Sequence, residues 1–316
     1  MIKTILPWLV TVASAWSLGY IYNVYGGGEL SWLLRMYDAK AALAEEIKAP
    51  RRLIVAAGSG AHYSVDSGLM SQELGIPVFN FGLQGDLGLN VICPLILKEA
   101  RKGDIILLIP EYLLLTDDDG IGYGDGLFGS IPFSIAKGDP LLPGASFDKI
   151  AEEAWLMGVP TLKAVVKSSL DLAQKGRMTG YLSDPIQKNG DPTKVKERTG
   201  EWWKLPVKQP ISRHSLMKID RFRKDLAAKG ATLIVSLPWI YGSHDPETLA
   251  NIRKSGELLS MVVPTIYNKD TLNIHDDPSI FADTHYHLLP QGRLVRSQEL
   301  VQQLRPIISA TKNQPY

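Results

Sequence analysis

The stretch Arg51–Asp66, RRLIVAAGSGAHYSVD, gives the clearest indication of the fold. Its apolar run, from Leu53 to Ala57, is typical of a short parallel strand that is buried on both faces. Only small residues surround Ser59, which follows directly. A tight turn would explain this pattern, and so would a serine nucleophile presented at the tip of a strand. The rest of the chain has to decide between these two interpretations.

Apolar runs and helical patterns alternate after this first strand. The helical patterns end at glycines, as helices commonly do. The predicted strands are 52–58, 76–82, 104–110 and 231–239, and the predicted helices between the first three are 64–75 and 86–103. This βαβαβ order predicts an α/β fold with a doubly wound, flavodoxin-like parallel sheet.

The middle of the chain interrupts this order. Residues 112–208 contain a triple aspartate, many glycines and a helical stretch at 145–176, and we interpret them as a cap or insertion over the sheet. The pattern of alternation then resumes. We expect helices at 29–48, 212–230 and 246–262, and a last helix that begins near Gly292.

The first 25 residues predict a membrane-spanning segment. After Lys3 come about twenty mostly apolar residues, the length that a helix needs to cross a bilayer. Two interpretations stay open, an uncleaved anchor and a signal peptide cut after Ala15. The apolar run continues past Ala15 as far as Tyr25, which favours the anchor. Either interpretation places residues 26–316, the α/β domain, outside the cytoplasm.

Composition excludes some classes of function. The 316 residues carry a net charge of +1, and no basic stripe with interleaved aromatic residues suggests nucleic-acid binding. The single cysteine, Cys93, rules out a disulfide within the chain, and its apolar surroundings are typical of core packing. No pattern suggests a metal site or a cofactor.

A serine nucleophile requires a base, and the base requires an orienting acid. The segment FADTHYHLLPQGR combines Asp283, His285 and His287 just before the last predicted helix. An α/β-hydrolase would carry its serine in a G-x-S-x-G elbow, whereas here Ala57 and Ala61 occupy the two glycine positions. We therefore exclude that fold and retain the order Ser, Asp, His.

These segments resemble the SGNH (GDSL-like) hydrolase superfamily. The likeness is strongest to membrane-anchored proteins of bacterial envelopes related to D-alanyl-transfer and exopolysaccharide acetylation proteins. The matching blocks are AGSGAHYSVD with Ser59, Asn80-Phe81-Gly82 with Gly85 close behind, and DTHYHL with Asp283 and His287. The resemblance implies a flavodoxin-like sheet and a catalytic triad of Ser59, His287 and Asp283.

The sequence departs from the family pattern at three places. The usual Gly-Asp-Ser block reads Ala57-Gly58-Ser59, so its Asp is missing. Asp283 and His287 are four residues apart instead of three, and Glu111 stands where an Asn-containing block is expected. His285 is the alternative base. The resemblance then leaves the oxyanion hole to the amides of Ser59 and Gly82, with the Asn80 side chain as a candidate donor. His62, Gly85 and Glu111 are candidate pocket residues.

Two functions remain open at this point. The first is a serine-dependent acyl hydrolase or O-acyltransferase, membrane-anchored, which acts on an acylated glycan or lipid-linked saccharide of the cell envelope. The second is a non-catalytic envelope protein that keeps the scaffold and binds a glycan or a partner protein. The missing Asn block motivates the second alternative.

Overall fold

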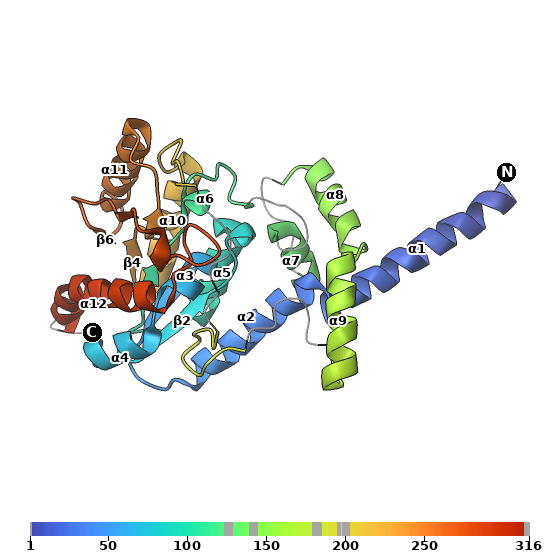
Figure 1. Cartoon of the computed structure of the whole chain (residues 1–316), viewed down its shortest axis with the longest axis horizontal. Coiled ribbons are helices and arrows are strands. Elements are labelled where there is room, and N and C mark those ends of the chain that lie inside the picture. The colour runs from blue at the N-terminus through green and yellow to red at the C-terminus, as the bar shows by residue number, and fades with distance from the viewer. Residues whose placement is uncertain are drawn as a thin grey trace. The chain divides into compact units, whose positions relative to one another are not determined.

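The computed structural model describes residues 2–122, 129–138, 145–178, 185–194, 197 and 203–312. The chain divides into two compact units. We call residues 1–39, 86–91 and 121–184 the helical unit, and residues 40–85, 92–120 and 185–316 the sheet unit. Figure 1 labels the elements of both.

A five-stranded parallel sheet forms the centre of the sheet unit, so the predicted α/β class is confirmed. Its order is β2-β1-β3-β4-β6, with residue bounds Leu53–Ala57 (β1), Val78–Gly82 (β2), Ile105–Leu108 (β3), Thr232–Ser236 (β4) and Thr265–Ile266 (β6). The first three strands are fully buried, as their continuous apolar runs require. A second parallel pair, Ile240–Tyr241 (β5) and Ile274–His275 (β7), was not predicted.

The order of the strands reverses between β1 and β3. The chain leaves β1 toward β2 on one side, and β3 continues toward β4 on the other. Open α/β sheets bind ligands at such a switch point, beyond the carboxyl ends of the strands. The residues that follow β1 and β3 are Gly58-Ser59 and Ile109 to Glu111, so the candidate serine lies at this point.

Helices cover the sheet of this unit. They are Ser59–Ser64 (α3), Ser67–Leu74 (α4), Tyr112–Leu115 (α6), Arg213–Ala228 (α10), Pro246–Ser260 (α11) and Pro290–Lys312 (α12), with Gly88–Glu99 (α5) shared between the units. Short 3-10 turns lie at Gly85–Leu87 (η1) and Pro278–Ile280 (η2). α3 packs on β1 and β2, and α12 packs against α3 and α4 (Figure 1).

The predicted helix 64–75 is in fact part of two helices. Val65 and Asp66 adopt extended backbone between α3 and α4, and the Asp66 carboxylate accepts a hydrogen bond from Leu69 N at 2.9 Å. This side-chain cap begins a new helix. The consequence for the candidate site is that α3 begins at Ser59 itself.

The helical unit contains Ile2–Tyr25 (α1), the first part of Glu29–Glu46 (α2), Ser130–Lys137 (α7), Phe147–Met157 (α8) and Leu162–Lys175 (α9). α1 begins a helical stretch that is long and apolar enough to cross a membrane. The predicted insertion 112–208 contributes to both units, since 121–184 clusters with α1 while 112–120 and 185–208 belong to the sheet unit. Part of that insertion lies outside the described residues.

Candidate functional site

Ser59 is the first residue of α3, directly after the Gly58 that follows β1. Its side chain is only partly buried. The flanking glycines are required by close packing, because an added Cβ at Gly58 would meet Glu111 and the backbone of Gly85, and one at Gly60 would meet Glu111. The small residues around the serine therefore let another chain segment approach its backbone closely.

That segment carries Glu111, which follows β3 and is only 1% exposed. One carboxylate oxygen accepts a hydrogen bond from Gly60 N at 2.6 Å, and the other accepts one from Gly58 N at 3.2 Å. Burial and the charge of Glu111 raise the pKa of Tyr286. A carboxylate therefore lies across the switch point, on the backbone that carries Ser59.

Asp283 and His287 form a close pair. His287 Nδ1 lies 2.7 Å from Asp283 Oδ1, and the imidazole is almost fully buried. Two contacts shape the loop: Ala282 N donates to His287 O at 2.8 Å, and His287 N donates to Thr284 Oγ1 at 3.0 Å. With Asp283 ionised, Nδ1 carries the shared proton and Nε2 is left as the basic nitrogen. The spacing of four residues therefore suffices for the acid–histidine pair.

His285 has a different partner. Its Nε2 lies 2.7 Å from the carbonyl oxygen of Trp203, and the two rings meet edge to face with centroids 5.7 Å apart. Because a carbonyl only accepts, Nε2 is the protonated nitrogen in this contact. Desolvation lowers the pKa of His285. His287 is thus paired with an acid, whereas His285 bonds a backbone carbonyl.

The loop that carries His287 packs against the helix that Ser59 begins. The Tyr63 ring on α3 lies between two imidazoles, with centroid distances of 4.6 Å to His62 and 4.6 Å to His287. Within the described part of the chain, no hydrogen bond joins Ser59 to His285 or His287. The structure therefore brings together the pair of Asp283 and His287 and sets it against α3.

The Asn80 side chain and the Gly82 amide, two of the predicted oxyanion donors, already form hydrogen bonds within the protein. Asn80 is fully buried, and its Oδ1 accepts from Gly82 N at 2.9 Å while its Nδ2 donates to His62 O at 3.1 Å and Asp191 Oδ1 at 3.0 Å. The amide of Gly82 is therefore occupied in this conformation, and so is the Asn80 side chain. Gly85, the first residue of η1, packs beside Gly58.

A buried lysine beside His62 escaped the sequence analysis. Lys40 Nζ donates to Gly82 O at 2.8 Å, to Asn80 O at 2.9 Å and to His62 Nδ1 at 3.0 Å. Desolvation lowers the pKa of Lys40 to about 7, against the opposing effect of Asp191. The signal was present in the sequence, because Lys40 continues the buried stripe of Leu33, Tyr37 and Ala44 at helical spacing. His62 thus belongs to a buried polar cluster.

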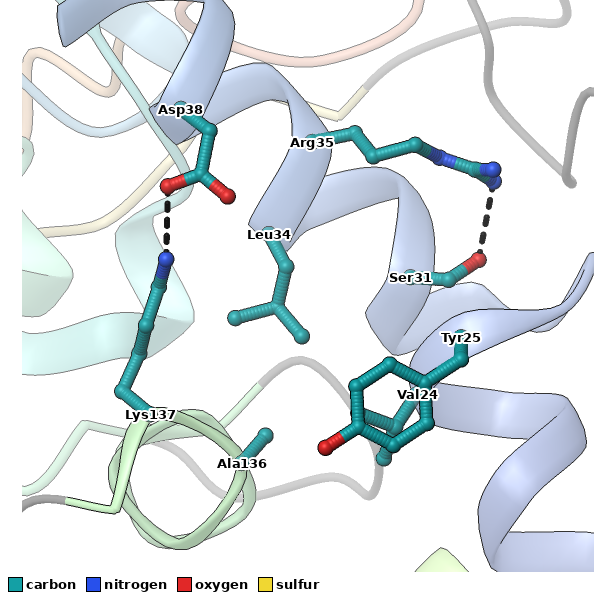
Figure 2. A pocket seen from close by; sticks show the side chains of 8 residues that line it. All are labelled: Val24, Tyr25, Ser31, Leu34, Arg35, Asp38, Ala136 and Lys137. Atoms are coloured by element: carbon teal, nitrogen blue, oxygen red, sulfur yellow. Dashed lines mark hydrogen bonds and ion pairs between the residues drawn. The ribbon is translucent and has the colours of Figure 1, made fainter.

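A pocket in the helical unit contains none of the predicted site residues. α1, α2 and α7 line it, and Figure 2 shows its ionic contacts. Lys137 Nζ lies 2.6 Å from Asp38 Oδ1, and Arg35 donates to Ser31 Oγ at 3.0 Å. Among the described residues, no group of three His, Cys, Asp or Glu side chains is placed to hold a metal ion.

No protein-family model and no curated protein sequence matches the chain.

Proposed function

We propose that the protein is a serine-dependent acyl hydrolase or O-acyltransferase of the SGNH type, acting on an envelope or extracellular glycan. One observation supports it most. His287 Nδ1 lies 2.7 Å from Asp283 Oδ1, on a loop that packs through Tyr63 against the helix beginning at Ser59. An acid-paired imidazole next to the helix of a strand-tip serine is the arrangement that activates a hydroxyl nucleophile.

The chemistry would proceed in two steps. Ser59 Oγ attacks the acyl carbonyl carbon while His287 Nε2 takes the hydroxyl proton, and the carboxylate of Asp283 stabilises the imidazolium. The alcohol of the donor ester leaves with that proton, so an acyl-serine remains. Water or a glycan hydroxyl then attacks the acyl-serine, and His287 again takes the proton and returns it to Ser59. A water nucleophile gives hydrolysis and a glycan hydroxyl gives acyl transfer.

Ser59 has to move within reach of His287 for this reaction. Catalytic hydrogen bonds are often long before substrate binds and tighten in the complex. The amide of Ser59, at the first position of α3, is the nearest backbone donor for the oxyanion.

The substrate class follows from the family resemblance and from α1. A helix able to span a membrane precedes the α/β domain, which would hold the domain at a membrane surface. With Lys3 on the cytoplasmic side, the domain would face the envelope or the exterior. An acylated glycan or a lipid-linked saccharide is the substrate that such a location offers.

The Glu111 carboxylate favours a second candidate, a non-catalytic scaffold that binds a glycan or a partner. An ionised carboxylate 2.6 Å from Gly60 N would oppose the negative charge that develops on an acyl oxygen beside Ser59. The Gly82 amide is also bonded to Asn80. Both features occupy positions where a hydrolase needs free donors.

Covalent labelling distinguishes the two candidates. The full-length protein in detergent micelles is treated with a fluorophosphonate probe, beside Ser59→Ala, His287→Ala and His285→Ala. If the protein is an enzyme, labelling should be lost in Ser59→Ala and His287→Ala and kept in His285→Ala, which changes the same loop and keeps the pair of Asp283 and His287. A wild-type protein that is folded and does not label favours the binding scaffold.

A further inference from the structure

A second part of the chain, besides α1, has a surface suited to lipid. α9 buries Ala164, Ser168 and Asp171 and exposes Leu162, which is 79% exposed, and Val166, which is 50% exposed. A helix on the surface of a water-soluble domain shows the opposite arrangement, with its apolar face inward. The buried charge is neutralised, since Lys167 and Lys175 both reach the Asp171 carboxylate.

The exposed apolar residues are numerous and span both helices and the turn between them. Large exposed apolar side chains that gather on one part of a protein mark an interaction surface. In the described part of α8, α9 and their connection they are Phe147, Trp155, Val159, Leu162, Val165, Val166, Leu170 and Leu172.

α8 and the turn between α8 and α9 contact the last third of α1. Trp16 Nε1 donates to Trp155 O at 3.1 Å, and Asn23 Nδ2 donates to Met157 O at 2.8 Å. Gly19 faces the backbone of Gly158 so closely that no side chain would fit there. Figure 1 shows α8 and α9 crossing this end of α1. Close contact through small residues is how helices associate within membranes.

The length of α1 fixes the depth of these contacts. A bilayer core about 30 Å thick needs about 20 helical residues. If Trp16 and everything after it lay in water, residues 2–15 would remain, about 14 residues that reach only ~21 Å at ~1.5 Å each. α1 can therefore span the hydrocarbon core only if residues Trp16 to Asn23 lie inside it. The end of α8 and the turn after it contact these residues, so they lie in the core as well.

The polar boundary lies just beyond α1. The mostly apolar sequence of α1 ends at Tyr25. After it, the pocket of Figure 2 contains the charged residues Arg35, Asp38 and Lys137. Arg35 and Asp38 are exposed, and exposed charged groups belong at the level of the lipid headgroups or outside them. The α8–α9 turn contacts α1 before this boundary, on its apolar side.

From these observations we propose that α8 and α9 form a second membrane-contact element, which lies in the outer part of the lipid bilayer beside the exit of α1. The occupant of the exposed apolar surface is lipid, because α8 and the turn after it contact α1 between Trp16 and Asn23, the part of α1 that lies in the bilayer when the helix spans it. The element would hold the helical unit against the membrane instead of leaving it on a flexible tether. This proposal rests on α1 spanning the bilayer and does not depend on the proposed reaction.

Spin labelling of single cysteines tests it on the full chain. Cys93 is buried and its thiol pKa is raised to about 12 by desolvation, so the native cysteine does not compete for the label. Labels are placed through Leu162→Cys and Leu170→Cys, two exposed positions on separate turns of α9. Leu9→Cys on α1 is the lipid-facing reference, and Met261→Cys, 80% exposed in the sheet unit, is the aqueous one.

The protein is reconstituted at low density in vesicles of phosphatidylethanolamine and phosphatidylglycerol, and relaxation by oxygen is compared with relaxation by a water-soluble nickel complex. The proposal predicts that labels at 162 and 170 respond more to oxygen, as at 9, and that the ratio inverts at 261. Labels at 162 and 170 that respond mainly to nickel would overturn it. Labels shielded from both reagents would show that protein covers the surface, and would overturn lipid as its occupant.

Discussion

Helix α9 of the helical unit and the core of the sheet unit bury opposite kinds of residue. The sheet unit buries charged side chains beside a partner of opposite charge, such as Arg52 with Asp104 and Arg296 with the partly exposed Glu299, and surrounds them with an apolar core. The helical unit contains α9, which buries Ala164 and Ser168 while it exposes Leu162. The contrast indicates that water surrounds the sheet unit and that a less polar medium surrounds α9.

This difference also separates two tasks. A reaction that moves protons and develops charge needs fixed, desolvated polar groups, and the sheet unit has them at its switch point. Attachment to a membrane needs exposed apolar surface, and the helical unit has that instead. The predictions below test this division, because each substitution should affect one unit's task and leave the other's unchanged.

The largest expected effect is on the reaction. His287→Ala should lower the rate of probe labelling by about 10²–10⁴-fold, the usual contribution of a general base. His285→Ala removes the contact with the Trp203 carbonyl and keeps the pair of Asp283 and His287, so it should change the rate little. Both labelling rates are measured by quenching the reaction at set times and reading the fluorescence of the protein band on a gel. Equal losses in the two variants would mean that the loop as a whole, and not the acid-paired imidazole, supports labelling.

The fold was largely predictable because its signals are local. The apolar runs at 53–57, 78–82 and 105–108 carry the parallel strands at almost their predicted bounds. The break at Asp66 was missed because its side-chain cap on Leu69 interrupts an otherwise continuous helical pattern. The two-residue strands β5, β6 and β7 are too short to produce a periodic pattern.

The candidate site was only partly predictable, for a different reason. Asp283 and His287 are neighbours in sequence, so their pairing could be proposed from spacing. The roles of Glu111 and Lys40 depend on contacts across 51 to 53 and 22 to 42 residues, and no local pattern encodes them. Composition gave no reason to expect a carboxylate on the backbone amides beside the serine.

The next largest effect is on the stability of the sheet unit. Arg52 donates to both oxygens of Asp104 and to the carbonyl of Glu99, and both charged side chains are almost fully buried. Arg52→Met leaves the carboxylate buried and unpaired, which should lower the free energy of unfolding by about 3–5 kcal/mol. Urea unfolding in micelles, followed by circular dichroism, measures it.

The double variant Arg52→Met with Asp104→Leu is the control for this measurement. It removes both charges, so it should be less destabilised than Arg52→Met alone. If the double variant loses as much stability as the two single variants together, there is no favourable interaction energy between Arg52 and Asp104.

A smaller effect comes from the buried lysine, and it depends on pH. Desolvation lowers the pKa of Lys40 in the folded chain to about 7, well below its unfolded value, so above pH 7 the unfolded state binds more protons. Stability should therefore rise with pH, by about 2 kcal/mol between about pH 7.5 and about pH 9. His62 and Asp191 are the ionisable groups that act on this ammonium.

Lys40→Met isolates this contribution. The variant loses the hydrogen bonds to Asn80 O and Gly82 O and should be less stable than the wild type throughout. The diagnostic feature is the slope: the rise of stability with pH should be absent in the variant. The same slope in both proteins would mean that Lys40 stays protonated when folded, held by its three acceptors.

The smallest expected effect tests the helical unit directly. Leu162→Ala should change the free energy of unfolding in micelles by less than about 0.5 kcal/mol, because the side chain is 79% exposed, touches little protein, and stays apolar where detergent covers it. Ile219→Ala on α10, where the side chain is fully buried, leaves a cavity in the core of the sheet unit and should cost about 2–5 kcal/mol. The pair matches an exposed apolar residue of one unit with a buried one of the other. A loss above about 1 kcal/mol in Leu162→Ala would mean that protein, as in a second copy of the chain, covers this surface in solution, and the two units would then not differ in the medium that surrounds them.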